Sequence, residues 1–205
     1  ATRFVKSDFT FLRPSASWGL AKILPILQNS PNGYSIKLAS QFTVDDLKGN
    51  NIVFIGSFKT LYSLHKFLHI FGLEYYFSLN RVSVKGNPGD SAKTFLPQEI
   101  KGGNYEKDFA VIAKGFGPEG STILLLLGFS DSGVIESSRA VVDTHMISLI
   151  TEKLAKGLYP DSKEFTLVIE TEGINQSIFK SQFKHFSQQS TSSKATVITL
   201  TDSTK

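Results

Sequence analysis

A loop with two glycines, two serines and an aspartate follows the most apolar stretch of the chain. It reads Gly128-Phe129-Ser130-Asp131-Ser132-Gly133 and comes directly after a run of four leucines. In open α/β sheets, ligands bind beyond the carboxyl ends of strands, where the first N–H groups of a helix are free. Glycines allow close backbone approach, and the polar side chains can hydrogen-bond a ligand. The candidate ligand-binding residues of this loop are Gly128, Ser130, Asp131, Ser132 and Gly133.

The same residue types also have a purely structural use at this position. Ser132 or Asp131 can act as the N-cap of the following helix, and the two glycines then only permit the turn. Capping needs the same side chains as ligand binding, and it is the commoner use. The sequence leaves both interpretations open.

A second strand-to-helix turn carries residue types found in phosphate-binding loops. Its candidate ligand-binding residues are Gly56, Ser57, Lys59 and Thr60. A P-loop has four residues between two glycines, followed by Lys and Ser or Thr, and here the second glycine is missing. If both turns lie at the same edge of the sheet, they can build one pocket. Ser57, Lys59 and Thr60 would then contact an anionic group of the ligand.

No motif for catalysis or metal binding stands out in the sequence. His65 and His69 have the spacing of two metal ligands on a helix, but Lys66 replaces the Glu of H-E-x-x-H and no third ligand is evident. The G-x-S-x-G elbow is absent, because the second glycine of GFSDSG stands one residue too far along. The sequence therefore predicts no catalytic residues, metal or cofactor. A hydrolase or transferase of unfamiliar design is the less favoured alternative.

The composition is that of an ordinary globular domain. Of the 205 residues, 40% are hydrophobic and 20% are charged, which allows a packed core. The net charge of +4 comes from scattered lysines, so nucleic-acid binding is not predicted. The absence of cysteine excludes disulfides, thiolate nucleophiles and Cys-ligated zinc. Residues 123–127 form the longest apolar run, far below the roughly 20 residues of a membrane span.

The location and the assembly state stay open at this stage. A cytoplasmic location is favoured, with a periplasmic or membrane-anchored one as the alternatives. The chain begins at Ala1, so a leader, an anchor or a partner domain could precede it. A homo-oligomer is also compatible with the sequence.

Hydrophobic periodicity predicts alternating strands and helices. Strands are expected at 34–40, 51–56, 73–80, 107–115, 121–128, 164–173 and 195–201, and helices at 16–29, 58–71, 134–143 and 145–157. Residues 178–187 fit a strand or a helix, and the strand is favoured. Residues 51–80 read as a strand-helix-strand unit with parallel strands and a right-handed crossover, and Ser57 is placed as the N-cap of its helix.

The connections between these elements are predicted from turn and cap residues. Asp143 caps the helix that follows it, and a short helical turn starts at Thr43 and ends at Gly49. Residues 107–128 form an antiparallel hairpin about a Pro-Glu-Gly turn. Residues 85–104 are expected to be a long loop.

Two segments carry a family resemblance, residues 51–68 and residues 108–143. Gly128, Asp131 and Gly133 match a Gly-x-x-Asp-x-Gly-like turn before a helix of small residues, and Gly56-Ser57 matches an earlier turn. In these features the chain resembles a little-characterised group of bacterial, Rossmann-like α/β domains. The resemblance implies a C-terminal sensor or regulatory portion of a longer protein, in some relatives behind a DNA-binding or membrane segment.

The sequence thus predicts one α/β domain over 1–205, with a mixed central sheet, helices on both faces and an antiparallel hairpin. Residues 1–33 are expected to form a helical N-terminal extension, and 187–205 a partly flexible tail with a short strand. The expected function is a non-catalytic domain that senses a small polar or anionic ligand at the two turns. The alternative is a protein-interaction or assembly domain whose turns are structural.

Overall fold

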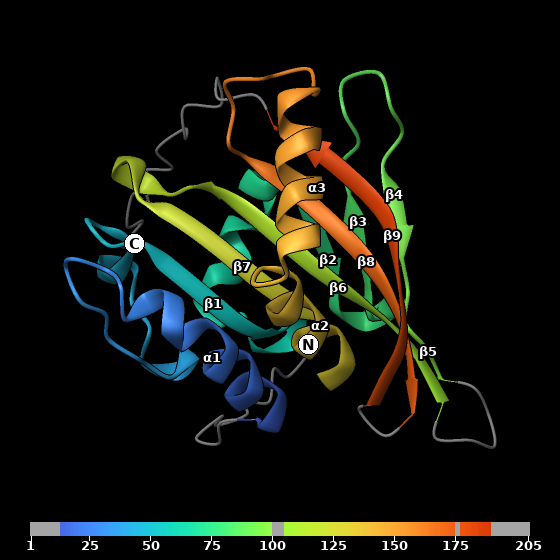
Figure 1. The fold of residues 1–205 in the computed structure, drawn as a ribbon, viewed down its shortest axis with the longest axis horizontal. Coiled ribbons are helices and arrows are strands. Elements are labelled where there is room, and N and C mark those ends of the chain that lie inside the picture. Colours follow the sequence, from blue (N-terminus) through green and yellow to red (C-terminus); the bar gives the residue numbers. More distant parts are fainter. Residues whose placement is uncertain (1–12, 100–104, 175–176, 190–205) are drawn as a thin grey trace, which may run out of the picture.

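A six-stranded mixed sheet forms the centre of the protein (Figure 1). Its strands lie in the order β1-β7-β6-β8-β9, and the short β5 pairs with β6. β1 runs parallel to β7, and the other neighbouring strands of this sheet are antiparallel. The strands are β1 (Ile52–Ser57), β5 (Gln98–Glu99), β6 (Tyr105–Phe116), β7 (Thr122–Gly128), β8 (Phe165–Ile174) and β9 (Ser177–Gln188). The structure is a computed structural model that describes residues 13–99, 105–174 and 177–189.

Three α-helices cover one face of this sheet. They are α1 (Pro14–Leu27), α2 (Asp131–Ala140) and α3 (Thr144–Ala155). Ile23, Ala140 and Ile150, one from each helix, belong to one buried cluster with sheet residues such as Ile112 and Leu167. α2 lies over the middle of the sheet, and α1 packs beside it, as Figure 1 shows.

A second layer of short elements covers the opposite face. It contains a three-stranded antiparallel sheet of β2 (Leu73–Tyr76), β3 (Arg81–Val84) and β4 (Lys93–Phe95). Short 3₁₀ helices surround it, namely η1 (Ala39–Gln41), η2 (Val44–Leu47), η3 (Phe58–Thr60), η4 (Tyr62–Phe71) and η5 (Phe77–Leu79). Phenylalanines from both layers, such as Phe58, Phe95 and Phe109, share the buried cluster between them. No helix of the described residues has the length and apolar character needed to cross a membrane.

The predicted fold class is confirmed. The protein is an α/β structure with a mixed central sheet and helices on both faces. β6 and β7 form the expected antiparallel hairpin, and η6 (Pro118–Gly120) lies in its turn. Residues 178–187 are part of β9, so the strand interpretation of that ambiguous segment is right.

The predicted parallel strand-helix-strand unit at 51–80 is wrong. β2 pairs with β3 in the small antiparallel sheet, and the parallel neighbour of β1 is β7. The expected helix is two 3₁₀ segments that meet at Leu61 and Tyr62, where the Tyr62 φ is 46°. Gly72, with a φ of 66°, then turns the chain into β2. A 3₁₀ helix of ten residues is not the long α-helical crossover that joins parallel strands.

Two further expectations also fail. Residues 34–40 form no strand, because the segment makes no ladder with a described neighbour and its first residues are exposed. The expected loop at 85–104 contains β4 and β5. The strand predicted at 195–201 lies outside the described residues. Strand propensity in a short segment is decided by the partner it meets, which the local pattern does not contain.

Candidate functional site

The two candidate turns lie side by side at one edge of the central sheet. β1 and β7 are parallel, and Ser57 at the end of β1 is paired with Gly128 at the end of β7. The carboxyl ends of both strands therefore meet, which is where ligands bind in open α/β sheets. This is the arrangement that a pocket shared by the two turns would need.

The second turn already holds an anion, the carboxylate of Asp108 from β6. Asp108 is 1% exposed. Its Oδ1 accepts the N–H groups of Phe109 (2.7 Å) and Phe129 (3.2 Å). Its Oδ2 accepts the N–H groups of Ser130 (2.9 Å) and Gly133 (2.7 Å), and the Ser130 hydroxyl (2.6 Å). These N–H groups at the start of α2 are the donors that a bound anion would need.

The remaining polar side chains of this turn are also used inside the molecule. The Ser132 hydroxyl donates to Glu106 of β6. Asp131 Oδ1 accepts the Ser15 hydroxyl of α1 at 2.6 Å. Ser130 occupies the N-cap position of α2, but its side chain bonds to Asp108 instead of to the helix. The cap of α2 thus comes from β6, not from Asp131 or Ser132.

Both glycines of the turn are required by close packing. A Cβ on Gly128 would lie 2.4 Å from the Val134 nitrogen, and one on Gly133 would lie 2.6 Å from Asp108 Oδ2. Either contact is shorter than side chains tolerate. The absence of a side chain at both positions lets the turn close around Asp108, and this accounts for both glycines without a ligand.

The first turn is arranged differently. Thr60 Oγ1 donates to the Ser57 carbonyl at 2.9 Å, and Ser57 itself is 2% exposed. Ser57 holds the N-cap position of η3, but its side chain makes no cap hydrogen bond. Lys59 is exposed to solvent. Gly56 and Thr60 of this turn line a cavity beside β1, and Ser57 and Lys59 do not line that cavity.

That cavity, here called the β1 cleft, has a volume of about 200 Å³ and runs along β1, which is an edge strand among the described residues. Five consecutive residues of β1 line it, 52–56, so it reaches both faces of the strand. α1 contributes Ser15, Ala16 and Leu20, and Arg13 lies just before this helix. The segment 36–39 and Phe42 form one wall of the cleft. Thr60, Leu61 and Leu64 complete the lining. None of the residues 128–133 lines it. The structure therefore places the two candidate turns together without merging them into one pocket.

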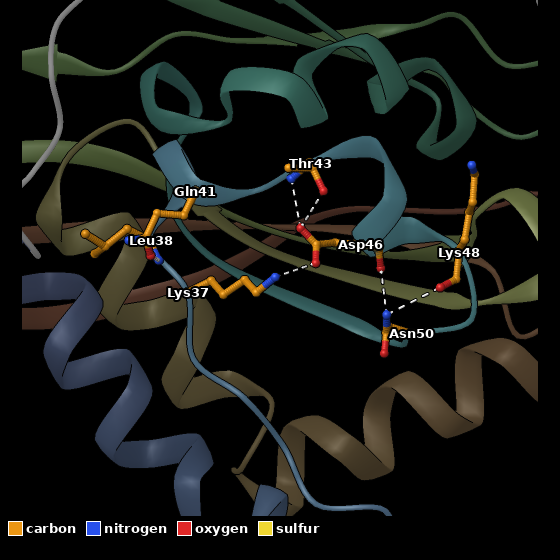
Figure 2. A network of polar contacts seen from close by, with 7 residues as sticks. All are labelled: Lys37, Leu38, Gln41, Thr43, Asp46, Lys48 and Asn50. Atoms are coloured by element: carbon orange, nitrogen blue, oxygen red, sulfur yellow. Dashed lines mark hydrogen bonds and ion pairs between the residues drawn. The ribbon is translucent and has the colours of Figure 1, made fainter.

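A polar network holds the wall of the β1 cleft in place (Figure 2). Lys37 donates to Asp46 Oδ1 at 2.6 Å, and the Thr43 N–H and hydroxyl donate to Asp46 Oδ2 at 2.8 and 3.0 Å. These hydrogen bonds, first from Lys37 and then from Thr43, lower the pKa of Asp46 from 3.8 to about 2. The Leu38 N–H donates to Gln41 Oε1 at 3.3 Å and tightens the same segment. The wall is thereby anchored to η2.

The β1 cleft combines an apolar interior with two cations. Its charged lining residues are Arg13 and Lys37. Lys37 is paired with Asp46, whereas no carboxylate of the described residues forms an ion pair with Arg13. A cleft with this lining can hold an apolar body by burial and an anionic group by a basic side chain.

The four histidines are dispersed. His65 packs against Phe77 with ring centroids 5.0 Å apart, and His69 and His145 are exposed. His185 is buried on β9. Within the described residues, no three side chains of His, Asp or Glu are grouped so that they could hold a metal ion.

Sequence reasoning missed the residues that organise this site. The sequence did contain a sign of the role of Asp108. This residue stands at the start of the apolar run DFAVIA, and a carboxylate that is buried there must find a hydrogen-bond partner. No local pattern indicated the roles of Glu106 and Ser15, because their hydrogen-bond partners, Ser132 and Asp131, lie 26 and 116 residues away in the chain. The sequence predicts a strand at 34–40, and that prediction does not indicate the part that residues 36–39 take in the lining of the cleft.

Comparison with known proteins provides no relative to argue from. No protein-family model, curated protein or solved structure matches the chain. The resemblance to bacterial α/β sensor domains stays a prediction. The function must be argued from the geometry of this site alone.

Proposed function

We propose that this chain is a non-catalytic sensing domain that binds a small amphipathic anion in the β1 cleft. The observation that carries the proposal is the combination of an apolar cavity of about 200 Å³ with Arg13 among the residues that line it. The ligand class is a short-chain or single-ring carboxylate. The second turn supports the cleft and does not bind the ligand, because its donors hold Asp108.

The size and lining of the cleft restrict the ligand. Sites for drug-sized molecules are usually about 300–1,000 Å³, so this one suits a smaller molecule. Most lining side chains are aliphatic or aromatic, among them Leu20, Phe42 and Leu64. Their burial against a ligand supplies affinity, and the carboxylate on Arg13 supplies orientation.

A route for signalling starts at α1. Ser15 lines the cleft and its hydroxyl donates to Asp131 in the first turn of α2. A ligand that shifts α1 changes this contact and so reaches α2, the helix over the middle of the sheet. A sensing role requires such a differential contact between the free and bound states.

The test is a thermal unfolding experiment with benzoate and hexanoate, and with benzyl alcohol as an uncharged probe. A carboxylate at a hundred times its Kd stabilises by about 2.7 kcal/mol, which raises the Tm by roughly 5–10 °C. Ala16→Leu fills the cleft and should abolish the shift, whereas Ala21→Leu on the exposed side of α1 should retain it. Arg13→Gln should remove the advantage of benzoate over benzyl alcohol, and Lys22→Gln should not.

Two outcomes would contradict the proposal. One is the absence of any stabilisation by both carboxylates in the wild-type protein. The other is a shift that persists in Ala16→Leu, which would place binding outside the β1 cleft. Sedimentation of the protein alone would then examine the assembly alternative.

A further inference from the structure

A second and larger cleft crosses the edge strand β9. It has a volume of about 760 Å³ and lies between the end of α3 and the connection from β3 to β4. Figure 1 shows the end of β9 running between these two elements. The volume is within the range of sites for small molecules, about 300–1,000 Å³. We call it the β9 cleft.

A β-bulge in β9 creates the floor of this cleft. Val168 of β8 pairs with His185 and the next residue, Ile169, pairs with Phe183, so Lys184 is the extra residue. Phe183 packs against the buried cluster under the α-helices, and His185 lies on the opposite face near Phe95. A bulge redirects side chains in this way. The strand thus contributes floor residues on both of its faces.

Gln188 ties both walls of the cleft to β9. Its side-chain amide donates to the Ser162 carbonyl at 3.1 Å and to the Tyr159 carbonyl, both in the connection after α3. Its backbone N–H donates to Asn87 Oδ1 at 3.0 Å, in the connection between β3 and β4. Gln188 is 2% exposed. The cleft is therefore preorganised, which lowers the entropy lost on binding.

The lining carries more positive than negative charge. Four lysines line the cleft, Lys93, Lys153, Lys156 and Lys184, against two carboxylates, Asp90 and Glu152. Lys156 pairs with Glu152 at 2.7 Å, and Lys184 pairs with Glu170, which also holds Lys107. Lys93 and Lys153 make no ion pair with a described carboxylate, and Lys153 lies 4.5 Å from the centre of the Phe183 ring.

A buried polar atom at the floor has no partner. His185 lines the cleft and is 6% exposed, and its Nε2 makes no hydrogen bond within the described residues. Burial lowers the pKa of His185 and the Lys93 charge acts in the same direction, whereas a hydrogen bond with the Lys85 backbone and the Asp90 charge act in the opposite one. A native structure seldom leaves such an atom unsatisfied unless a ligand or water completes the site.

We infer that the β9 cleft binds a phosphorylated small molecule, with its phosphoryl groups between Lys93 on one wall and Lys153 on the other. Lysine ammonium groups are compact point charges that suit phosphate oxygens. The cleft is large enough for several phosphoryl groups or for one with an organic body. This site is separate from the β1 cleft, so the inference does not depend on the proposed function.

The test is isothermal titration calorimetry with inorganic tripolyphosphate and with ATP. The double variant Lys93→Gln/Lys153→Gln should weaken tripolyphosphate binding by about tenfold. The matched double variant Lys22→Gln/Lys66→Gln removes the same charge from exposed lysines elsewhere and should retain the wild-type Kd. Tighter binding of ATP than of tripolyphosphate would show that the cleft also takes the organic body, and equal binding that phosphoryl groups suffice. Both variants are expected to melt as the wild type does.

Three results would overturn the inference. The first is no binding of either probe to the wild-type protein. The second is equal weakening in both double variants, which would mean unspecific attraction to the net charge. The third is binding of tripolyphosphate that the double variant Lys93→Gln/Lys153→Gln does not weaken, which would place the phosphoryl groups elsewhere.

Discussion

Asp108 decides the character of the second glycine turn. Four backbone N–H groups and one hydroxyl donate to its carboxylate, in a place where it is 1% exposed. A buried carboxylate is tolerated only with such compensation. In return it satisfies the first N–H groups of α2. The turn is therefore an anion cradle whose anion is part of the chain.

Asp108→Asn should destabilise the protein by about 2–4 kcal/mol, because the amide NH₂ faces N–H donors that then lack an acceptor. Urea unfolding measures this as a lower midpoint at an unchanged slope. Asp161→Asn, at an exposed position, is the matched control and should stay within about 0.5 kcal/mol of wild type. Equal stability of Asp108→Asn and wild type would show that the cradle does not depend on the negative charge.

At the scale of elements, the wall of the β1 cleft shows how a segment without regular structure is positioned. Residues 36–38 form neither helix nor strand. The 3₁₀ helix η2 presents Asp46 to both Lys37 and Thr43, and so fixes the wall from outside it. A loop anchored to a neighbouring helix can line a cleft while its own backbone makes no ladder.

Asp46→Asn should loosen this wall, and the effect should depend on pH. The pKa of Asp46 is lowered in the folded protein to about 2, below its ordinary value of 3.8. Its contribution to stability is therefore fully present above about pH 4 and is lost as the pH falls through about 2. Urea unfolding of wild type and variant should differ most at neutral pH and converge toward pH 2.

Asp45→Asn is the control for this pH dependence. Asp45 lies on the same 3₁₀ helix and pairs with Lys48 on the surface, where an ion pair contributes little. Asp45→Asn should therefore leave the urea unfolding midpoint unchanged at every pH. A difference between wild type and Asp46→Asn that stays constant from pH 7 to pH 2 would contradict the role of its charge.

At the scale of the whole molecule, Gln188 connects three distant parts of the chain. Its Oε1 accepts the Tyr159 N–H at 3.1 Å, and its Nε2 donates to carbonyls after α3. Its backbone N–H reaches Asn87, 101 residues away. The α-helical layer and the small antiparallel sheet are thus both held to the end of β9. Buried hydrogen bonds of this kind fix the positions of the two outer layers relative to the central sheet.

Gln188→Ala should lower the free energy of unfolding by about 1–3 kcal/mol, since it leaves the Tyr159 N–H without its acceptor. It should also weaken tripolyphosphate binding in the β9 cleft, because the α3 wall is released while the backbone bond to Asn87 remains. Gln28→Ala, at an exposed position just after α1 and outside both clefts, is the control for both measurements. Full stability of Gln188→Ala would mean that the walls are held by their other contacts.

The sequence by itself determined the elements whose signals are local. β1 and β7 followed from short apolar runs, and α3 followed from Asp143, whose side chain accepts the Met146 N–H at 2.8 Å as a cap should. The positions of both glycine turns at strand ends were also correct. Each of these features depends on residues within a few positions of one another.

Only the tertiary structure decided what these elements do together. β1 pairs with β7 across more than 60 residues, and β2 enters the small sheet instead of the central one. Asp108 fills the turn that looked open, and the β1 cleft forms where α1 and the segment 36–42 meet β1, the last strand of the central sheet within the described residues. Strand partners and buried charges are settled by contacts between distant segments, and hydrophobic periodicity carries no information about which segments will meet.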